Sequence, residues 1–185
     1  LVERVTGQRL DSYVSEQLLE PLGMHATHFN PIGTPAPSAT YAASEHCGWR
    51  NRLLEGEVHD ENCCAWEGVS GHAGLFGTAP DLALYCRAWL NCDPRLGAAE
   101  LQRDSQRLHA ETAEGERRGL GWVLAPAGMA GRHEGYGHTG FTGTSLWISP
   151  ERGTFGVLLT NRVHPHRQRM TAMTGLRAAF HNLVL

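Results

Sequence analysis

The sequence contains no lysine, and all 16 of its basic residues are arginines. This absence excludes a phosphate-binding loop of the Gly-Lys-Ser/Thr type, in which the lysine contacts the phosphates of a nucleotide. A dinucleotide-binding glycine fingerprint after a predicted strand is missing as well. No long run of basic residues occurs, and the formal net charge is -3 at pH 7. A nucleic-acid partner is therefore not expected.

Long apolar runs are also missing, so the sequence predicts no segment that spans a membrane. The chain has no Gly-x-Ser-x-Gly nucleophile motif and no C-x-x-C pair. Its five cysteines, an odd number, show no disulfide framework and are more typical of a reducing compartment. With 41% hydrophobic and 19% charged residues over 185 positions, the composition is that of a globular chain able to bury a core. No cofactor is predicted.

The spacing of apolar residues predicts several helices and strands. A 3.6-residue period predicts helices at 1–5, 11–20, 78–92, 98–113 and 167–183. Short β-rich segments predict strands at 120–124, 145–148 and 154–160, and the stretches 28–44 and 63–74 are expected to be loops. The residues expected to face the core are Leu10, Val14 and Leu18 in the second helix, Leu82, Tyr85, Cys86 and Trp89 in the third, Leu101 and Leu108 in the fourth, and Met170, Met173, Leu176, Phe180 and Leu183 in the last.

The stretch from Gly135 to Pro150 combines glycines, hydroxyl side chains and one histidine with a strand that follows them. Glycine weakens a strand, and it is found there where a ligand or another backbone comes close. Gly140 and Gly143 flank Phe141 and Thr142, so the backbone can bend at this point and present its N–H groups. Such groups can donate hydrogen bonds to a substrate carbonyl. We therefore expect a strand that borders an active site.

His138-Thr139-Gly140 resembles the third motif, Lys/His-Thr/Ser-Gly, of the serine β-lactamases and penicillin-binding proteins. The strand at 154–160, the dipeptide Asn161-Arg162 and a final helix follow in the order of that family's C-terminal end. Gly71-His72-Ala73-Gly74-Leu75-Phe76 before a capped helix is a second match. Val58-His59-Asp60-Glu61-Asn62 resembles the class C and esterase-like branch that includes penicillin-binding protein 4B.

The resemblance covers nearly the whole chain and implies an α+β fold, the C-terminal part of a β-lactamase/transpeptidase-like domain. It implies a helical lobe with cleft loops over 1–115, and antiparallel strands with a packed C-terminal helix over 116–185. Catalysis in this family uses Ser-x-x-Lys and Tyr-x-Asn/Ser, and a chain without lysine cannot carry the first motif. We therefore interpret the chain as an incomplete domain whose nucleophile lies outside these residues.

As part of a longer protein, the chain is expected to serve a bacterial serine hydrolase that cleaves amide or ester bonds through an acyl-enzyme. The substrate would be a small molecule or a peptide: a β-lactam, a D-Ala peptide or a small ester. Alone, the chain is expected to be inactive, and apolar surface left by the missing part is expected to promote association. The alternative hypothesis is a non-catalytic binding or interaction module with the same fold. The compartment stays open between the cytoplasm and the cell envelope.

The resemblance also assigns roles to the residues of the third motif. His138 takes the place of the lysine, with positive charge or a hydrogen-bond donor, and Thr139 binds a substrate carboxylate or carbonyl. After Gly140, the backbone N–H of Phe141 supplies half of the oxyanion hole. Because histidine changes its charge near neutral pH, substrate binding is predicted to weaken as the pH rises. The structural alternative is a glycine-rich turn with a hydrogen-bonded histidine.

A second group of candidates is expected to bind substrate from loops around the cleft: His59, Asp60, Asn62, His72 and Gly143. The favoured alternative is structural, with His72 and Asp60 hydrogen-bonded to loop backbone. His59, Asp60 and His72 are also metal-ligand types, but their spacing matches no metal motif, so no metal site is predicted. A triad of Ser70, His72 and Asp60 is a further arrangement, although their spacing does not place the hydroxyl on the ring.

Overall fold

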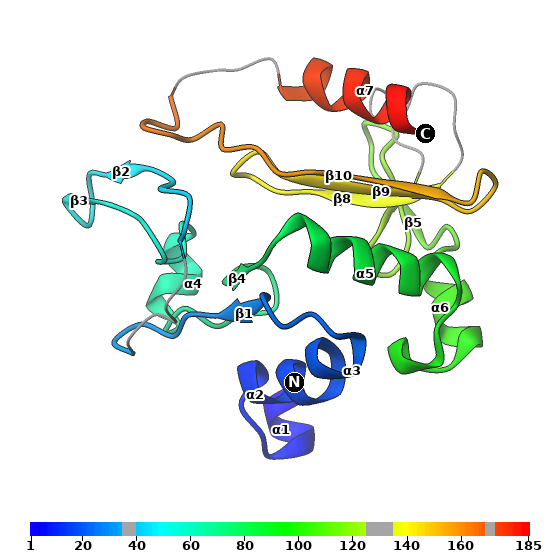
Figure 1. Cartoon of the computed structure of the whole chain (residues 1–185), viewed down its shortest axis with the longest axis horizontal. Helices are drawn as coiled ribbons and strands as arrows, with labels where there is room; N and C mark the ends of the chain where they lie inside the picture. The colour runs from blue at the N-terminus through cyan, green and yellow to red at the C-terminus, as the bar shows by residue number, and fades with distance from the viewer. Residues whose placement is uncertain (35–39, 125–134, 169–172) are drawn as a thin grey trace. The chain divides into compact units, whose positions relative to one another are not determined.

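The computed structural model describes residues 1–34, 40–124, 135–168 and 173–185. Within it the chain forms two compact units, whose elements are labelled in Figure 1. The first unit contains Leu1–Asp81 and Asn161–Met170, and the second contains Leu82–Thr160 and Thr171–Leu185. These limits follow contacts between residues, whereas the predicted segments 1–115 and 116–185 follow the type of element. The segment boundary at 115 stays a prediction.

The first unit begins with three short helices and a π turn. They are α1 (Val2–Thr6), α2 (Leu10–Val14), the π turn Ser15–Leu19 and α3 (Glu20–Leu22). The helices predicted at 1–5 and 11–20 are confirmed, but the second continues past Pro21 and ends at Gly23, whose φ is 77°. A π turn holds one extra residue and so rotates the helix face that follows it. Leu19 is therefore buried, while the predicted Leu18 is only half-buried.

The first unit also contains short strands and one helix that were not predicted; β1 (His28–Phe29) and the last residues of α4 (Glu61–Ala65) fall within the predicted loops 28–44 and 63–74, and the prediction is wrong there. β1 pairs with β4 (Leu75–Phe76), and β2 (His46–Cys47) pairs with β3 (Arg52–Leu53), both antiparallel. The helix α4 begins after Asp60, whose carboxylate accepts a hydrogen bond from the N–H of Cys63. Strands of two residues are too short to show an alternating pattern, so the sequence does not reveal them.

The second unit is built on an antiparallel sheet that has six strands among the described residues. They lie in the order β10 (Thr154–Leu158), β9 (Ser145–Ser149), β8 (Tyr136–Thr139), β7 (Val123–Leu124), β6 (Arg117–Arg118) and β5 (Ala110–Glu111). The strands predicted at 120–124, 145–148 and 154–160 are confirmed, although the first and the last are shorter than predicted. Thr139 lies opposite Ser145 in the register, so a tight turn at 140–144 joins β8 to β9.

Two helices cover the two faces of this sheet, α5 (Ala79–Leu90) on one and α7 (Met173–Val184) on the other (Figure 1). Cys86 of α5 packs in a core cluster with Tyr136 and Ile148, so the inward face predicted for this helix is confirmed. On the face toward α7, Trp147 is fully buried and packs against Leu185. Successive residues of β9 therefore point to opposite helices, as the pleat of a strand requires.

The helix α6 (Ala99–Ser105) is shorter than predicted, and it buries a different face. Leu101 is 69% exposed and Leu108 is 47% exposed, so both core predictions are wrong. Gln102 is buried instead, because its amide donates hydrogen bonds to the carbonyl oxygens of Asp93 at 2.8 Å and Gly97 at 2.9 Å. A polar side chain thus occupies the inward position and satisfies the carbonyls of the preceding turn.

The last helix is described over Met173–Val184, and residues 167 and 168, where its start was predicted, form a turn. Its inward residues include the predicted Met173 and the unpredicted His181, which is fully buried. Leu176 is 46% exposed and Leu183 is 86% exposed, so these two core predictions are wrong. The predicted core residue Met170 lies outside the described residues. The helix faces the sheet with polar groups because the sheet offers hydrogen-bond partners at the end of β8 and the start of β9.

Candidate functional site

Strand β8 ends with two of the predicted catalytic residues, His138 and Thr139, and the turn between β8 and β9 carries the other two, Gly140 and Phe141. The N–H of Gly140 donates to the carbonyl of Thr144 at 2.8 Å, and the N–H of Gly143 donates back to the carbonyl of Gly140 at 3.1 Å. Gly143 has a φ of 117°, a backbone conformation that residues other than glycine rarely adopt. The glycines therefore permit a compact turn, with the Phe141 side chain 58% exposed on it.

His138 lies at the exposed end of β8. Its Nδ1 is 2.9 Å from the carbonyl oxygen of Thr139, and its Nε2 is 3.5 Å from Nη1 of Arg118. This arrangement fits a ring whose Nδ1–H donates to the carbonyl and whose Nε2 faces the guanidinium. Arg118 of β6 was not predicted, and its guanidinium also binds the carboxylate of Glu116, with 2.6 Å between Nη2 and Oε1. Its only trace in the sequence is a pair of adjacent arginines in a short polar strand.

Three residues that the sequence analysis did not single out hold the turn in place. Arg177 of α7 donates from Nη2 to the carbonyl of Gly140 at 2.7 Å and to that of Thr144 at 2.9 Å. The hydroxyl of Thr160 donates to the carbonyl of Gly143 at 2.6 Å. His181 of α7 is hydrogen-bonded to Ser145, the first residue of β9, with 3.0 Å between Nε2 and Oγ.

Burial lowers the pKa of His181 to about 4, and the nearby charge of Arg177 adds to this shift. Burial disfavours the charged form of an imidazole because the protein interior solvates the charge less well than water does. His181 is thus neutral at physiological pH and can share a hydrogen bond with the Ser145 hydroxyl. Arg177 and the neutral His181, both on α7, therefore hold this side of the turn through hydrogen bonds.

The second group of predicted residues belongs to the first unit, apart from Gly143. There, His72 lies between two partners: its Nε2 is 3.0 Å from Oδ1 of Asp60, and its Nδ1 is 3.0 Å from Oγ of Ser70. The sequence spacing alone did not establish this contact, and the structure places the Ser70 hydroxyl within hydrogen-bond distance of the ring. Ser70 is buried, however, and its hydroxyl also donates to the carbonyl of Ala73 at 3.2 Å. This geometry fits a loop held by its own side chains better than an exposed nucleophile.

Asp60 performs two tasks at once. Its Oδ1 accepts the N–H of Cys63 at 2.7 Å, which caps the start of α4, and also faces His72. The hydrogen bond from Cys63 and that from His72 lower the pKa of the Asp60 carboxyl, against the opposing effect of burial. Asn62, the next predicted residue, is exposed on the first turns of the same helix. Asp60 and His72 therefore fix the loop beside an exposed amide.

His59 lies in the interior of the first unit, where it forms part of an ionic cluster. Its Nε2 is 2.7 Å from the carboxylate of Glu45, which Arg167 also binds at 2.7 Å. Arg167 bridges to Glu61 at 2.6 Å. The hydrogen bonds from Arg167 lower the pKa of Glu45 to about 2, and both carboxylates raise the pKa of Arg167. The cluster ties residues distant in sequence together, and its buried Glu45 carried no motif by which the sequence could reveal it.

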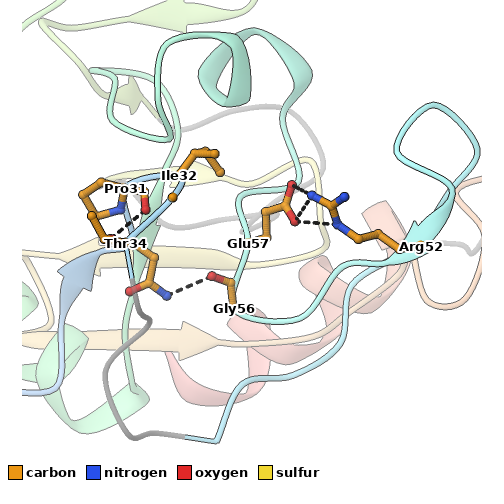
Figure 2. A pocket seen from close by; sticks show the side chains of 8 residues that line it. Pro31, Ile32, Thr34, Arg52, Gly56 and Glu57 are labelled. Carbon is orange, nitrogen blue, oxygen red and sulfur yellow. Dashed lines mark hydrogen bonds and ion pairs between the residues drawn. The ribbon is translucent and has the colours of Figure 1, made fainter.

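A hollow of about 170 Å³ opens elsewhere on the first unit, and Figure 2 shows its lining. Arg52 of β3 and Glu57 of the loop that follows face one another, with Nη2 of Arg52 2.8 Å from the Glu57 carboxylate. The Asn30 amide donates to the carbonyl of Gly56 at 2.9 Å beside them. None of the predicted catalytic or substrate-binding residues lines this hollow.

Among the described residues, no cluster of three or more histidine, cysteine, aspartate or glutamate side chains is arranged to hold a metal ion. The same described part of the chain has no helix with the length and apolar character that crossing a membrane requires. All five cysteines are free thiols. The chemistry available at the turn is therefore that of backbone N–H groups, an imidazole, a hydroxyl and arginine.

Comparison with known proteins places these features in a family. The sequence matches the Beta-lactamase family model over residues 1–179. It is 34% identical over 184 residues to a protein of Bacillus subtilis named N-acetylmuramyl-L-alanine amidase, with 89% of this chain and 42% of that protein covered. It is 36% identical over 191 residues to a putative D-alanyl-D-alanine carboxypeptidase of Escherichia coli K12, with the same two shares covered. The chain thus spans less than half the length of these relatives.

A solved structure shows the same fold. The penicillin-binding protein from Bacillus halodurans superposes with a TM-score of 0.64 at 17% identity, over 98% of this chain and 52% of that one. The helix, sheet and helix of the second unit, with the short elements of the first, agree with the predicted α+β class. By the extent of the family match, the chain belongs to the Beta-lactamase family and has the β-lactamase and penicillin-binding-protein fold.

Proposed function

We propose that this chain supplies the His-Thr-Gly strand and the oxyanion turn of a serine hydrolase that cleaves amide bonds of peptidoglycan-like substrates. The observation that carries the proposal is the turn after His138-Thr139: an exposed imidazole and a half-buried hydroxyl precede a glycine turn in a chain of this family. The names of the B. subtilis amidase and the E. coli carboxypeptidase, two relatives, support an amide substrate from the cell wall.

The proposed reaction proceeds through an acyl-enzyme. A serine hydroxyl adds to the carbonyl carbon of the amide and gives up its proton, and the resulting tetrahedral oxyanion collapses with cleavage of the C–N bond. The amine leaves with a proton, and water then cleaves the serine ester. Since the sequence has no lysine to complete Ser-x-x-Lys, the proposal places the serine and its base outside these 185 residues.

Within this proposal each residue of the turn has a role. The N–H of Phe141 donates to the oxyanion, which needs a donor already in place when the charge develops. Gly140 and Gly143 permit the turn that carries this N–H, and Thr139 binds a carbonyl or carboxylate of the substrate. His138 provides positive charge or a hydrogen-bond donor where the family motif commonly has lysine, and the guanidinium of Arg118 lies beside it.

In the first unit, we propose that the exposed His72 and Asn62 contact the substrate. Asp60 holds His72 and the start of α4, and His59 is tied to Glu45, so both act by positioning the loop. The second candidate function, a binding module without catalysis, is favoured by the missing lysine. The two functions differ in one property, the formation of a covalent acyl-enzyme.

A labelled β-lactam and a fluorophosphonate test this proposal. We expect them to label one serine in the longest protein that the gene encodes, at a position outside the present sequence, and to leave the 185-residue chain unlabelled. Matched variants are Thr139→Val in the motif and Ser70→Ala in the hydrogen-bonded loop. Labelling that is lost in Ser70→Ala would contradict the proposal and point to the Ser70–His72–Asp60 chain. No labelling in either protein would support the binding module.

A further inference from the structure

The geometry points to Arg177 as a positioning residue that orients and polarises the peptide between Gly140 and Phe141. This inference rests on the proposed function, because it concerns the N–H that would bind the oxyanion. Arg177 lies on α7, 37 residues along the chain from Gly140, and nothing in its sequence neighbourhood indicates this role. The inference joins two elements of the second unit, the helix and the β8–β9 turn.

Three hydrogen bonds to backbone carbonyls fix the turn. One nitrogen of Arg177, Nη2, donates to the carbonyl of Gly140 at 2.7 Å and to that of Thr144 at 2.9 Å. The Gly140 carbonyl also accepts the N–H of Gly143 at 3.1 Å. Two donors therefore fix one carbonyl, and the two carbonyls bound by Arg177 lie at the two ends of the turn.

The direction of the Phe141 N–H follows from the planarity of the peptide group. The carbonyl of Gly140 and the N–H of Phe141 belong to the same peptide, which is trans. In a trans peptide the C=O and N–H bonds point in opposite directions. When Arg177 holds the carbonyl, it therefore turns the N–H of Phe141 away from the guanidinium. Rotation of this peptide would break the hydrogen bonds from both Arg177 and Gly143.

The effect of Arg177 on this peptide is also electrostatic. A hydrogen bond from a guanidinium to a carbonyl is charge-assisted and is roughly twice as strong as a neutral one. The positive charge draws electron density toward the carbonyl oxygen, which makes the N–H at the other end of the peptide a better donor. A donor that is oriented before the reaction needs no rearrangement when the oxyanion forms. Arg177 would thus act on the reaction without touching the substrate.

The helix itself is fixed in the position that this role requires. Four residues after Arg177, on the same face of α7, His181 is hydrogen-bonded to Ser145 at 3.0 Å. Met173, one turn before Arg177, is buried, and its sulfur is 4.0 Å from the Thr160 hydroxyl. Both neighbours hold α7 on the sheet, so the guanidinium is presented to the turn by a rigid element rather than by a loop.

The experiment compares Arg177→Met and Arg177→Lys with Arg152→Met in the longest protein that the gene encodes. Arg152 is the matched control, since it also donates within the second unit to a backbone oxygen, that of Leu185, but away from the turn. With a peptidoglycan-type amide as substrate, we expect Arg177→Met to lower kcat about tenfold to hundredfold and to change KM by less than about threefold. Arg177→Lys should restore part of kcat, and Arg152→Met should leave it unchanged.

A second measurement is independent of activity. Amide hydrogen exchange of residues 137–147 should become at least about tenfold faster in Arg177→Met and should stay unchanged in Arg152→Met. If the wild-type protein shows no acyl transfer, the proposed function fails, and the exchange measurement still decides whether Arg177 holds the turn. Unchanged exchange in Arg177→Met, or a fall in thermal stability with kcat unaffected, would overturn the inference.

Discussion

Nε2 of His181 lies 3.0 Å from the hydroxyl oxygen of Ser145, and both side chains are buried in the second unit. The bond links the last helix to the first residue of β9, directly after the turn that carries the candidate oxyanion donor. A buried imidazole of this kind has to stay neutral, and this requirement makes the stability of the fold depend on pH.

His181→Gln should remove a loss of stability in mild acid. Above pH 6.5 the His181 imidazole is neutral in both the folded and the unfolded chain. Below pH 6.5 the unfolded chain binds a proton at this residue, whereas the folded chain binds it only near pH 4. The wild-type free energy of unfolding should therefore fall by about 1–2 kcal/mol between pH 7 and pH 5 through this group. Urea unfolding of the variant should show a shallower fall. The exposed His25→Gln is the control, and an equal pH slope in wild type and His181→Gln would contradict the prediction.

Glu45→Gln should destabilise the first unit at neutral pH. The carboxylate is bound by Arg167 and His59, and its pKa is lowered from 4.5 to about 2. Its stabilising effect is therefore fully present above pH 4.5 and is lost as the pH falls toward 2. We expect the variant to lose roughly 2–4 kcal/mol at pH 7 in thermal or urea unfolding, and the difference from wild type to shrink below pH 4. The exposed Glu100→Gln should behave as wild type; a constant difference at all pH values would argue against this account.

Gly137→Ala should disrupt the pairing of β8 with β9. An added methyl carbon would lie 2.2 Å from the carbonyl oxygen of Leu146 and 2.3 Å from a ring carbon of Trp147, where neither the backbone nor a buried ring can move away easily. We expect a loss of about 3 kcal/mol or more. Gly175→Ala is the matched control: it lies in α7 with open space around it, and it should stabilise by about 0.5–1 kcal/mol. Thermal unfolding distinguishes the two, and equal effects would show that steric contact is not the cause.

The strands and the turn after His138-Thr139 could be predicted because their sequence signals are local. Ser145–Ser149 and Thr154–Leu158 are β-rich runs bounded by turn residues, and the glycines around Phe141 mark the turn between β8 and β9. The helix α5 was readable for the same reason, since its inward face around Cys86 follows the helical period.

The errors in the predicted core share one physical cause, which is that long-range contacts override the local sequence pattern. Leu101 is exposed because Gln102 reaches the carbonyls of the preceding turn, and Leu183 is exposed because α7 turns His181 to the sheet. Both helices bury a polar residue whose partners lie elsewhere in the sequence. Hydrophobic periodicity does not identify such residues, because it assigns polar side chains to the outside.

Some properties of this protein need nothing beyond the order of its residues. The lack of lysine rules out Ser-x-x-Lys, and the run from His138 to Gly143 limits that part of the chain to a motif strand and a tight turn. The tertiary structure adds contacts between residues that are far apart in the sequence. Arg177 donates a hydrogen bond to the Gly140 carbonyl, and the buried Glu45 binds His59 and Arg167. These contacts form because buried charges and carbonyls require partners, and the packed elements determine which partners are within reach.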